Sequence, residues 1–147
     1  MSRREEEIRR ALAELQALRE LAESMRSRIN MVDSFINELK AAGEAIKAIR
    51  DVGENATILV PVGGDSFIRA KVEDMSKVLV GVGAGVVLEK DVEDALNYLG
   101  ERVAELEKMS VDLRKHLAET LERIRESEDR IRSMAGEERA GGGVRKA

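Results

Sequence analysis

The chain has 147 residues, of which 37% are charged and only 2% are aromatic, and it carries a net charge of −4. A compact core of this length normally uses more large rings, so this composition favours long helices or a coiled coil. The mixed charge argues against a nucleic-acid partner, and the absence of Cys excludes disulfides, thiol catalysis and Cys-based zinc sites.

Residues 1–51 are predicted to form a first long coiled-coil helix. Apolar residues recur with alternating spacings of three and four from Ile8 to Ile46, and the pattern holds for six heptads without a slip. The a positions are Ile8, Leu15, Ala22, Ile29, Ile36 and Gly43, and the d positions are Ala11, Leu18, Met25, Val32, Leu39 and Ile46. A repeat sustained at about 3.5 residues predicts a left-handed coiled coil.

Residues 52–90 change character, because they hold six of the twelve glycines and the only proline, Pro61. Short β-branched runs bounded by turn residues are typical of strands, and they occur at 57–62, 66–72, 77–82 and 85–90. The connection Gly63-Gly64-Asp65 is of the hairpin type, and a second hairpin is expected around Gly83-Ala84. We therefore expect two β-hairpins in this region.

The glycines Gly81, Gly83 and Gly85 raise the alternative of a phosphate-binding loop. The dinucleotide fingerprint requires a further glycine where Val86 stands, and it requires a helix that starts there, whereas the run that follows is typical of a strand. The sequence therefore favours a hairpin turn. His116 is the only histidine and lies among charged helical residues, so neither a metal site nor a nucleophile–base pair is indicated.

Residues 91–135 are predicted to form a second coiled-coil helix, and 136–147 a disordered tail. The a positions run from Leu96 in steps of seven to Ile131, with Ser110 among them. The d positions run from Val92 in steps of seven to Met134, with Thr120 and Ser127 among them. Because the two helical segments are of matching length, we expect them to fold back and pair antiparallel, with both termini at the far end. Two separate helices that bind other chains are the alternative.

The two hairpins are too small to support an independent core, and no disulfide is available to stabilise them. Their strands are apolar on both faces in places, so we expect them to mediate oligomerisation. Apolar side chains also lie near the free ends of the helices. They either close the helical hairpin or form an apolar surface of low specificity that clamps other chains.

The segment "ILVPVGGDSFIRAKVEDMSKVLVGVGAGVVLEKDVEDAL" at 58–96 resembles archaeal prefoldin subunits of the alpha class. The turn "VPVGGDSFI" and the hairpin "VGVGAGVVLEK" carry the resemblance, and the order of helix, two hairpins and helix extends it over nearly the whole chain. The implied fold is α+β, a long antiparallel coiled-coil hairpin whose two central β-hairpins oligomerise into a β-barrel platform. No apolar run approaches a membrane span of about 20 residues and no signal peptide is indicated, so we expect a cytoplasmic protein without a membrane partner.

The resemblance implies a molecular chaperone subunit that works without ATP and needs no cofactor or metal. Two alpha-class chains would join four beta-class chains, hold unfolded polypeptides and deliver them to the group II chaperonin. Its implied assembly residues are Ile58, Val60, Phe67, Ile68, Val78, Val80, Val86 and Leu88. Its implied client-binding tip residues are Ile8, Leu12, Leu15, Leu121, Ile124, Ile131 and Met134. The alternative is a self-assembling alpha-like relative that forms a homo-oligomeric or filamentous scaffold.

Overall fold

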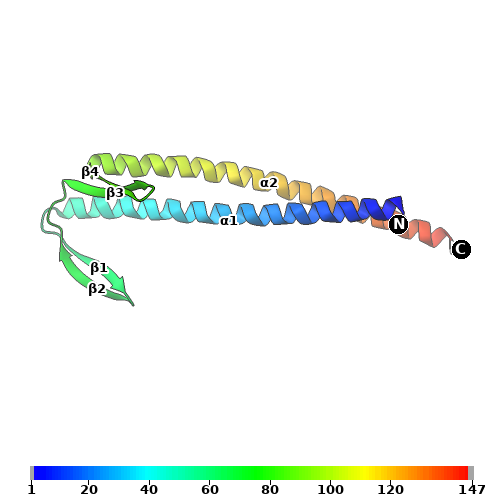
Figure 1. Ribbon diagram of the computed structural model, residues 1–147, viewed down its shortest axis with the longest axis horizontal. Helices are drawn as coiled ribbons and strands as arrows, with labels where there is room; N and C mark the ends of the chain where they lie inside the picture. Colours follow the sequence, from blue (N-terminus) through cyan, green and yellow to red (C-terminus); the bar gives the residue numbers. More distant parts are fainter. Residues whose placement is uncertain (1, 146–147) are drawn as a thin grey trace. The chain divides into compact units, whose positions relative to one another are not determined.

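The computed structural model describes residues 2–145, with side chains described for residues 2–136. The elements are α1 (Arg3–Val52), β1 (Thr57–Gly63), β2 (Ser66–Lys71), β3 (Lys77–Gly83), β4 (Val86–Asp91) and α2 (Val92–Arg145), in the order shown in Figure 1. This order of a long helix, two hairpins and a second long helix confirms the predicted α+β class.

The chain divides into two compact units, and each contains a stretch of both helices. The arm unit consists of residues up to Asp33 and from Lys108 onward, and the base unit consists of Ser34–Glu107. In the arm unit the seam buries Ala11, Leu15, Ala22, Ile29, Ser110 and Thr120. In the base unit the buried helical residues are Ile36, Val92, Ala95, Leu99 and Leu106. Most of these fall on predicted a and d positions, so the heptad pattern identified the buried stripe.

The helices run antiparallel within each unit. In the arm unit Arg19 pairs with Glu128 and Asp33 with Arg114, so the residue number falls on α2 as it rises on α1. In the base unit Arg50 of α1 pairs with Glu93 at the start of α2, at 2.7 Å. The prediction that the chain folds back on itself is thus confirmed within both units, against two helices bound to other chains.

The ends of α1 follow from local sequence. The Ser2 hydroxyl accepts a hydrogen bond from the amide of Glu5 at 3.2 Å, which is half of a capping box. At the other end Gly53 adopts a φ of 93° and donates its amide to the Ile49 carbonyl, as expected of a helix-terminating glycine. The helix therefore begins and ends where the sequence supplies caps.

The second helix begins directly after β4 and carries Glu93 and Asp94 in its first turn, where acidic residues complement the helix dipole. The helix extends to Arg145, past the end expected at Ala135. The predicted disorder over 136–147 stays a prediction, because its last two residues and nearly all of its side chains lie outside the described residues.

Both hairpins use a two-residue turn with positive φ at both positions. These are Gly64 and Asp65 in the first hairpin (57° and 57°), and Ala84 and Gly85 in the second (52° and 74°). Such turns match the right-handed twist of the strands. The strand β4 starts at Val86, so the glycine-rich segment is a hairpin turn, and the alternative of a helix that opens on a phosphate is wrong.

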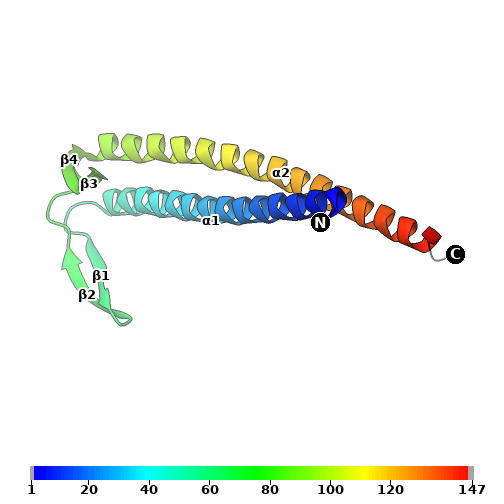
Figure 2. The ribbon, with the colours of Figure 1, turned by 45° about the vertical axis from the view of Figure 1, so that its right-hand side comes forward.

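The two hairpins repeat one another in register. Thr57 pairs with Lys71 in the first hairpin, and the equivalent pair twenty positions later is Lys77 with Asp91. Both ladders shift register at the same place, two residues before the turn, and each forms its own two-stranded sheet (Figure 2). Neither sheet has a third strand among the described residues, so every strand keeps one unpaired edge.

Candidate functional site

One face of the second hairpin lies against helix α2. Val80 on this face is only 7% exposed, which a two-stranded sheet alone cannot achieve. Lys90, which pairs with Val78, places its ammonium 5.4 Å from the centre of the Tyr98 ring on α2, a cation–π distance. An ion pair between Lys77 and Asp91 at 2.7 Å closes the open end of the hairpin and raises the pKa of Lys77.

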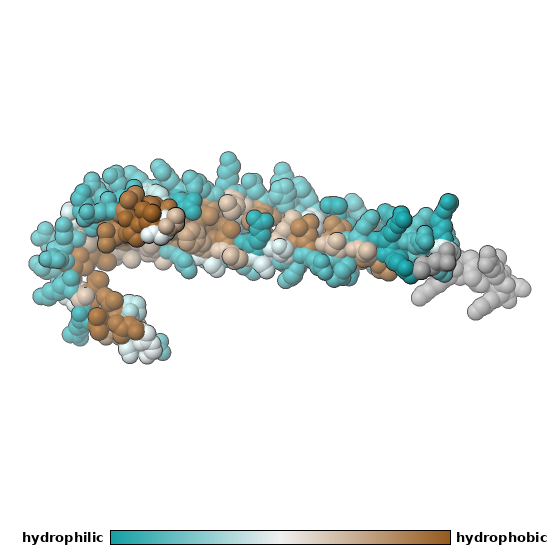
Figure 3. Space-filling view, in the orientation of Figure 1, coloured by the Kyte–Doolittle hydropathy of each residue, from teal (hydrophilic) through white to brown (hydrophobic). Residues whose placement is uncertain are grey.

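The opposite face of the second hairpin is open to solvent. Leu79 is 73% exposed and Val87 is 59% exposed, although both are large apolar residues. In the first hairpin the equivalent residues Leu59 and Phe67 are likewise exposed. Apolar side chains gather over both hairpins in Figure 3. We call these four residues the outer face. On each hairpin they leave apolar surface uncovered, of a kind that marks protein contacts.

The structure brings the predicted assembly residues together on the two hairpins but gives them different surroundings. Val80 is buried within the chain itself. Ile58, Val60 and Val78 are half-buried, whereas Phe67, Ile68, Val86 and Leu88 are exposed. Sequence reasoning included Phe67 but omitted Leu59, Leu79 and Val87, which are among the most exposed apolar residues. The alternation of apolar residues on both faces was the signal that could have found them.

The predicted tip residues lie in the arm unit, on the parts of the two helices that pair there. Leu12 and Leu121 are exposed, at 49% and 37%. Leu15 is buried in the seam, and Ile8, Ile124, Ile131 and Met134 are half-buried. The set therefore divides into side chains that close the helical hairpin and side chains that are accessible to another molecule. Leu12 and Leu121 are the accessible ones.

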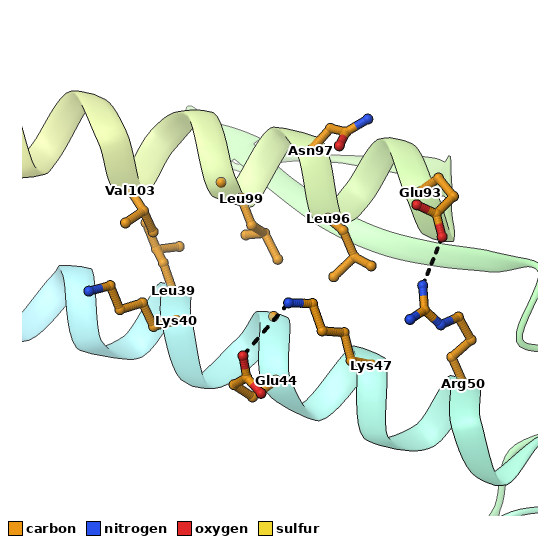
Figure 4. Close-up of a pocket in the computed structure, with 12 residues that line it drawn as sticks. Leu39, Lys40, Glu44, Lys47, Arg50, Glu93, Leu96, Asn97, Leu99 and Val103 are labelled. Atoms are coloured by element: carbon orange, nitrogen blue, oxygen red, sulfur yellow. Dashed lines mark hydrogen bonds and ion pairs between the residues drawn. The ribbon is translucent and has the colours of Figure 1, made fainter.

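A groove of about 740 Å³ opens between the helices of the base unit (Figure 4). Its floor consists of Leu39, Leu96, Leu99 and Val103, and both helices contribute a glycine, Gly43 and Gly100. Apart from the adjacent residues and the nearby backbone of the same helix, no heavy atom lies within 4 Å of the position that a Cβ would take at either glycine. The missing side chains thus account for the hollow.

The charges at the rim of this groove are paired with one another. Arg50 contacts Glu93 at 2.7 Å, Lys40 contacts Glu107 at 3.0 Å, and Lys47 lies 3.8 Å from Glu44. The rim therefore offers no strong net field to a charged ligand.

The most tightly bonded polar cluster joins the two helices of the arm unit. The Ser110 hydroxyl donates to a carboxylate oxygen of Asp33 at 2.7 Å, and Arg114 pairs with the other oxygen. The Ser110 hydrogen bond and the Arg114 guanidinium lower the pKa of Asp33. Ser110 is a buried seam residue, so Asp33 supplies the partner that its hydroxyl requires.

The described residues contain no group of three or more His, Cys, Asp or Glu side chains that could hold a metal ion. His116 lies exposed on α2, 3.6 Å from Glu119. None of the described helices is both long enough and apolar enough to cross a membrane.

Comparison with known proteins agrees with these features. The family described as "Prefoldin subunit" matches residues 18–137. The prefoldin subunit alpha of Methanopyrus kandleri is 33% identical over 77% of this chain and 72% of that protein. The subunit of the same name from Thermofilum pendens is 31% identical over 84% of this chain and 95% of that protein. A chain of filamentous PFD from Methanocaldococcus jannaschii, solved by cryo-EM, aligns with a TM-score of 0.67 at 31% identity, covering 76% of this chain and 93% of that one.

Proposed function

The chain belongs to the prefoldin family as an archaeal alpha-class subunit, and on that premise we propose that it holds unfolded proteins without nucleotide. The family consists of chaperone subunits that assemble into oligomers.

Assembly is proposed to proceed through the two hairpins. The observation that carries this proposal is the outer face, where Leu59, Phe67, Leu79 and Val87 are all more than half exposed. Burying one such side chain contributes about 1.5–3 kcal/mol, so leaving four in water is costly unless a partner covers them. Each strand also keeps an unpaired edge that another chain can extend. The proposed partners are beta-class prefoldin subunits, with four of them joined to two alpha-class chains.

Client binding is proposed to occur at the free end of the arm unit. Unfolded chains expose apolar side chains without a fixed sequence. A partly exposed apolar seam can cover these side chains by apolar contact, without a catalytic base, a bound phosphate or a metal. Leu12 and Leu121 are the accessible members of the predicted set. The half-buried Ile8, Ile124, Ile131 and Met134 would add area when the ends of the helices fray. Because a holding chaperone binds the unfolded state, it suppresses aggregation by mass action alone.

Serine substitution of the two exposed leucines tests this placement. We expect Leu12→Ser with Leu121→Ser to weaken holding of an unfolded test protein at least about tenfold, since each leucine contributes on the order of 1 kcal/mol or more when covered. The matched control is Met109→Ser, which removes an apolar side chain of similar exposure (48%) from the same unit, farther from the free end than either leucine. Equal holding by the double variant, with its helicity unchanged, would place the client site elsewhere.

A second candidate function is a scaffold built from copies of this chain alone. The observation that favours it is the structural likeness to a chain of filamentous PFD. Size measurement of the pure chain separates the two candidates. Large assemblies without any beta-class chain would support the scaffold, whereas a small species that converts to a defined mixed oligomer on addition of that chain would support the chaperone.

Delivery to a group II chaperonin in the cytoplasm is proposed from the family resemblance. The test is transfer of a labelled unfolded protein from the assembled oligomer to that chaperonin. No transfer, with holding intact, would limit the function to holding.

A further inference from the structure

Three ion pairs between α1 and α2 lie on one edge of the helical seam. They are Arg19 with Glu128 at 3.2 Å, Asp33 with Arg114, and Lys40 with Glu107 at 3.0 Å. On each helix these residues follow a seam position by four, which is the e position of the heptad. We call these positions the e edge. It consists of Leu12, Arg19, Arg26, Asp33, Lys40 and Lys47 on α1, and of Glu93, Gly100, Glu107, Arg114, Leu121 and Glu128 on α2.

The charges along the e edge are not uniform. The charged residues of the α1 edge are basic with one exception, Asp33, and those of the α2 edge are acidic with one exception, Arg114. The two exceptions pair with each other. We propose that this pair of inverted polarity is a register key, which selects one alignment of α1 against α2 and disfavours alignments that differ by a heptad.

A slip of one heptad in either direction illustrates the selection. If α2 moves so that Asp33 meets Glu107, two acids face each other and Arg26 meets Arg114. If α2 moves the other way, Lys40 meets Arg114 and Asp33 faces Leu121, an apolar residue. The observed register has three attractive pairs on this edge and no repulsive one. Like charges placed opposite one another across a coiled coil are a known means of excluding wrong alignments.

The buried hydroxyl of Ser110 strengthens the selection. Ser110 is 6% exposed at a seam position, and its hydroxyl donates to Asp33 at 2.7 Å. In either slipped alignment this acceptor moves away by a heptad, which leaves a buried polar group without its partner. The seam pattern alone does not distinguish alignments that differ by seven residues, because apolar positions recur at that period. The Asp33–Arg114 pair and Ser110 do not recur with the heptad, so they distinguish these alignments.

The same edge disfavours pairing between like helices of two copies. An α1 helix that paired with the α1 helix of a second copy would bring two mostly basic edges together, and two α2 helices would bring mostly acidic edges together. In an oligomer with several arms, the edge therefore favours pairing of an α1 helix with an α2 helix over pairing of like helices. This inference concerns pairing of the helices and does not depend on the proposed chaperone function.

Exchanging the two exceptions gives a discriminating variant. The double substitution Asp33→Arg with Arg114→Asp keeps all three attractions in the observed register, but it gives each slipped register three attractions as well. If the Asp33–Arg114 pair only stabilises the arm, the exchanged variant keeps the observed register. If the pair selects the register, the exchanged variant also populates the slipped registers. The matched control is Arg19→Glu with Glu128→Arg, which exchanges the charges of an ordinary pair and leaves the slipped registers disfavoured.

The register can be measured by pulsed electron–electron double resonance between spin labels on Cys introduced at Ser27 and Glu126. The full chain has no other Cys, and both positions are exposed. An excess of unlabelled chain removes distances between copies. A slip of seven residues moves one label by about 10 Å along the axis. The slip that brings Asp33 to Glu107 lengthens the label distance, and the opposite slip shortens it.

We expect one distance for the unsubstituted arm and for the Arg19/Glu128 exchange, and additional shorter and longer distances for the Asp33/Arg114 exchange. If the latter exchange does not fold, Asp33→Ala with Arg114→Ala serves instead. That variant leaves two attractions in the observed register and two in the slip that shortens the distance, so an added shorter distance is expected. A single unchanged distance in every folded variant would overturn the proposal.

Discussion

The carboxylate of Asp33 on α1 accepts a hydrogen bond of 2.7 Å from the buried Ser110 hydroxyl of α2. This contact joins two residues that are far apart in sequence and places a polar layer inside a mostly apolar seam, where Thr120 is also buried. Most buried seam residues of the arm unit are aliphatic, so the polar layer is its most specific interhelical contact.

The polar layer predicts acid sensitivity of the arm. The Ser110 hydrogen bond and then Arg114 lower the pKa of Asp33 from its ordinary value of 3.8. A carboxyl whose folded pKa is depressed stabilises the fold above its unfolded pKa, and this contribution is lost as the pH falls through the folded pKa. We therefore expect the melting temperature to fall on acidification below 3.8, and to fall less in Asp33→Asn.

Circular dichroism melts at about pH 6 and about pH 3 measure this difference. Asp112→Asn is the control, since Asp112 is exposed on α2 and has no described hydrogen bond or ion pair. If Asp33→Asn and the control lose the same number of degrees as the unsubstituted chain, Asp33 does not carry the acid sensitivity.

The outer face predicts that assembly is more sensitive to Leu79 than to its neighbours. Leu79→Asp places a charge on an exposed position of β3, so the chain itself should fold normally. In an assembly that covers this position, the loss of about 2 kcal/mol or more per site corresponds to about thirtyfold weaker association. Analytical ultracentrifugation with a beta-class partner measures it. The control is Glu89→Gln, the cross-strand neighbour of Leu79.

Val80 lies on the opposite face of the second hairpin from Leu79. Its substitution therefore tests packing within the chain and not contact with a partner. It is buried within the chain, so Val80→Asp buries a charge and should disrupt the packing of the hairpin before any partner binds. An assembly that survives Leu79→Asp with unchanged affinity would show that partners do not cover the outer face.

Replacing the two glycines that line the groove of the base unit by alanine is expected to raise the stability of the chain. Apart from the adjacent residues and the nearby helix backbone, no heavy atom lies within 4 Å of a Cβ at Gly43 or Gly100, and neither has a positive φ. Alanine at an internal helical position is more stable than glycine by about 1 kcal/mol, so each substitution should raise the melting temperature by about 2–4 °C. Gly83→Ala is the opposite control, because Gly83 has a φ of 108°. A lower melting temperature in Gly43→Ala would mean that the groove needs its open form.

The sequence predicted the elements well because their signals are local. The heptad run from Ile8 to Ile46 defined α1, and the turn signals at Gly63-Gly64-Asp65 and around Gly83-Ala84 indicated the hairpins. The second turn lies one residue later than expected, at Ala84-Gly85. Alternation along β3 likewise defined two faces. It did not show that the Val80 face lies against α2, because that choice depends on contacts such as Lys90 with the Tyr98 ring.

The register between the helices was also beyond sequence reasoning. A heptad pattern repeats every seven residues and so permits several alignments of equal apolar quality. The pairing of Asp33 with Ser110 and Arg114 became apparent only from the structure. Exposure at the tip was partly predictable, since Leu12 lies off the seam and Leu15 lies on it, and they are exposed and buried respectively.

Aggregation of a chemically unfolded test protein, diluted into this chain with and without a beta-class subunit and with no nucleotide present, tests the chaperone function most directly. We expect suppression to appear or rise sharply when the partner is added, because the hairpins then assemble and several arms act on one client. No suppression under either condition, with mixed assembly verified by mass, would contradict the proposal that this chain holds unfolded proteins.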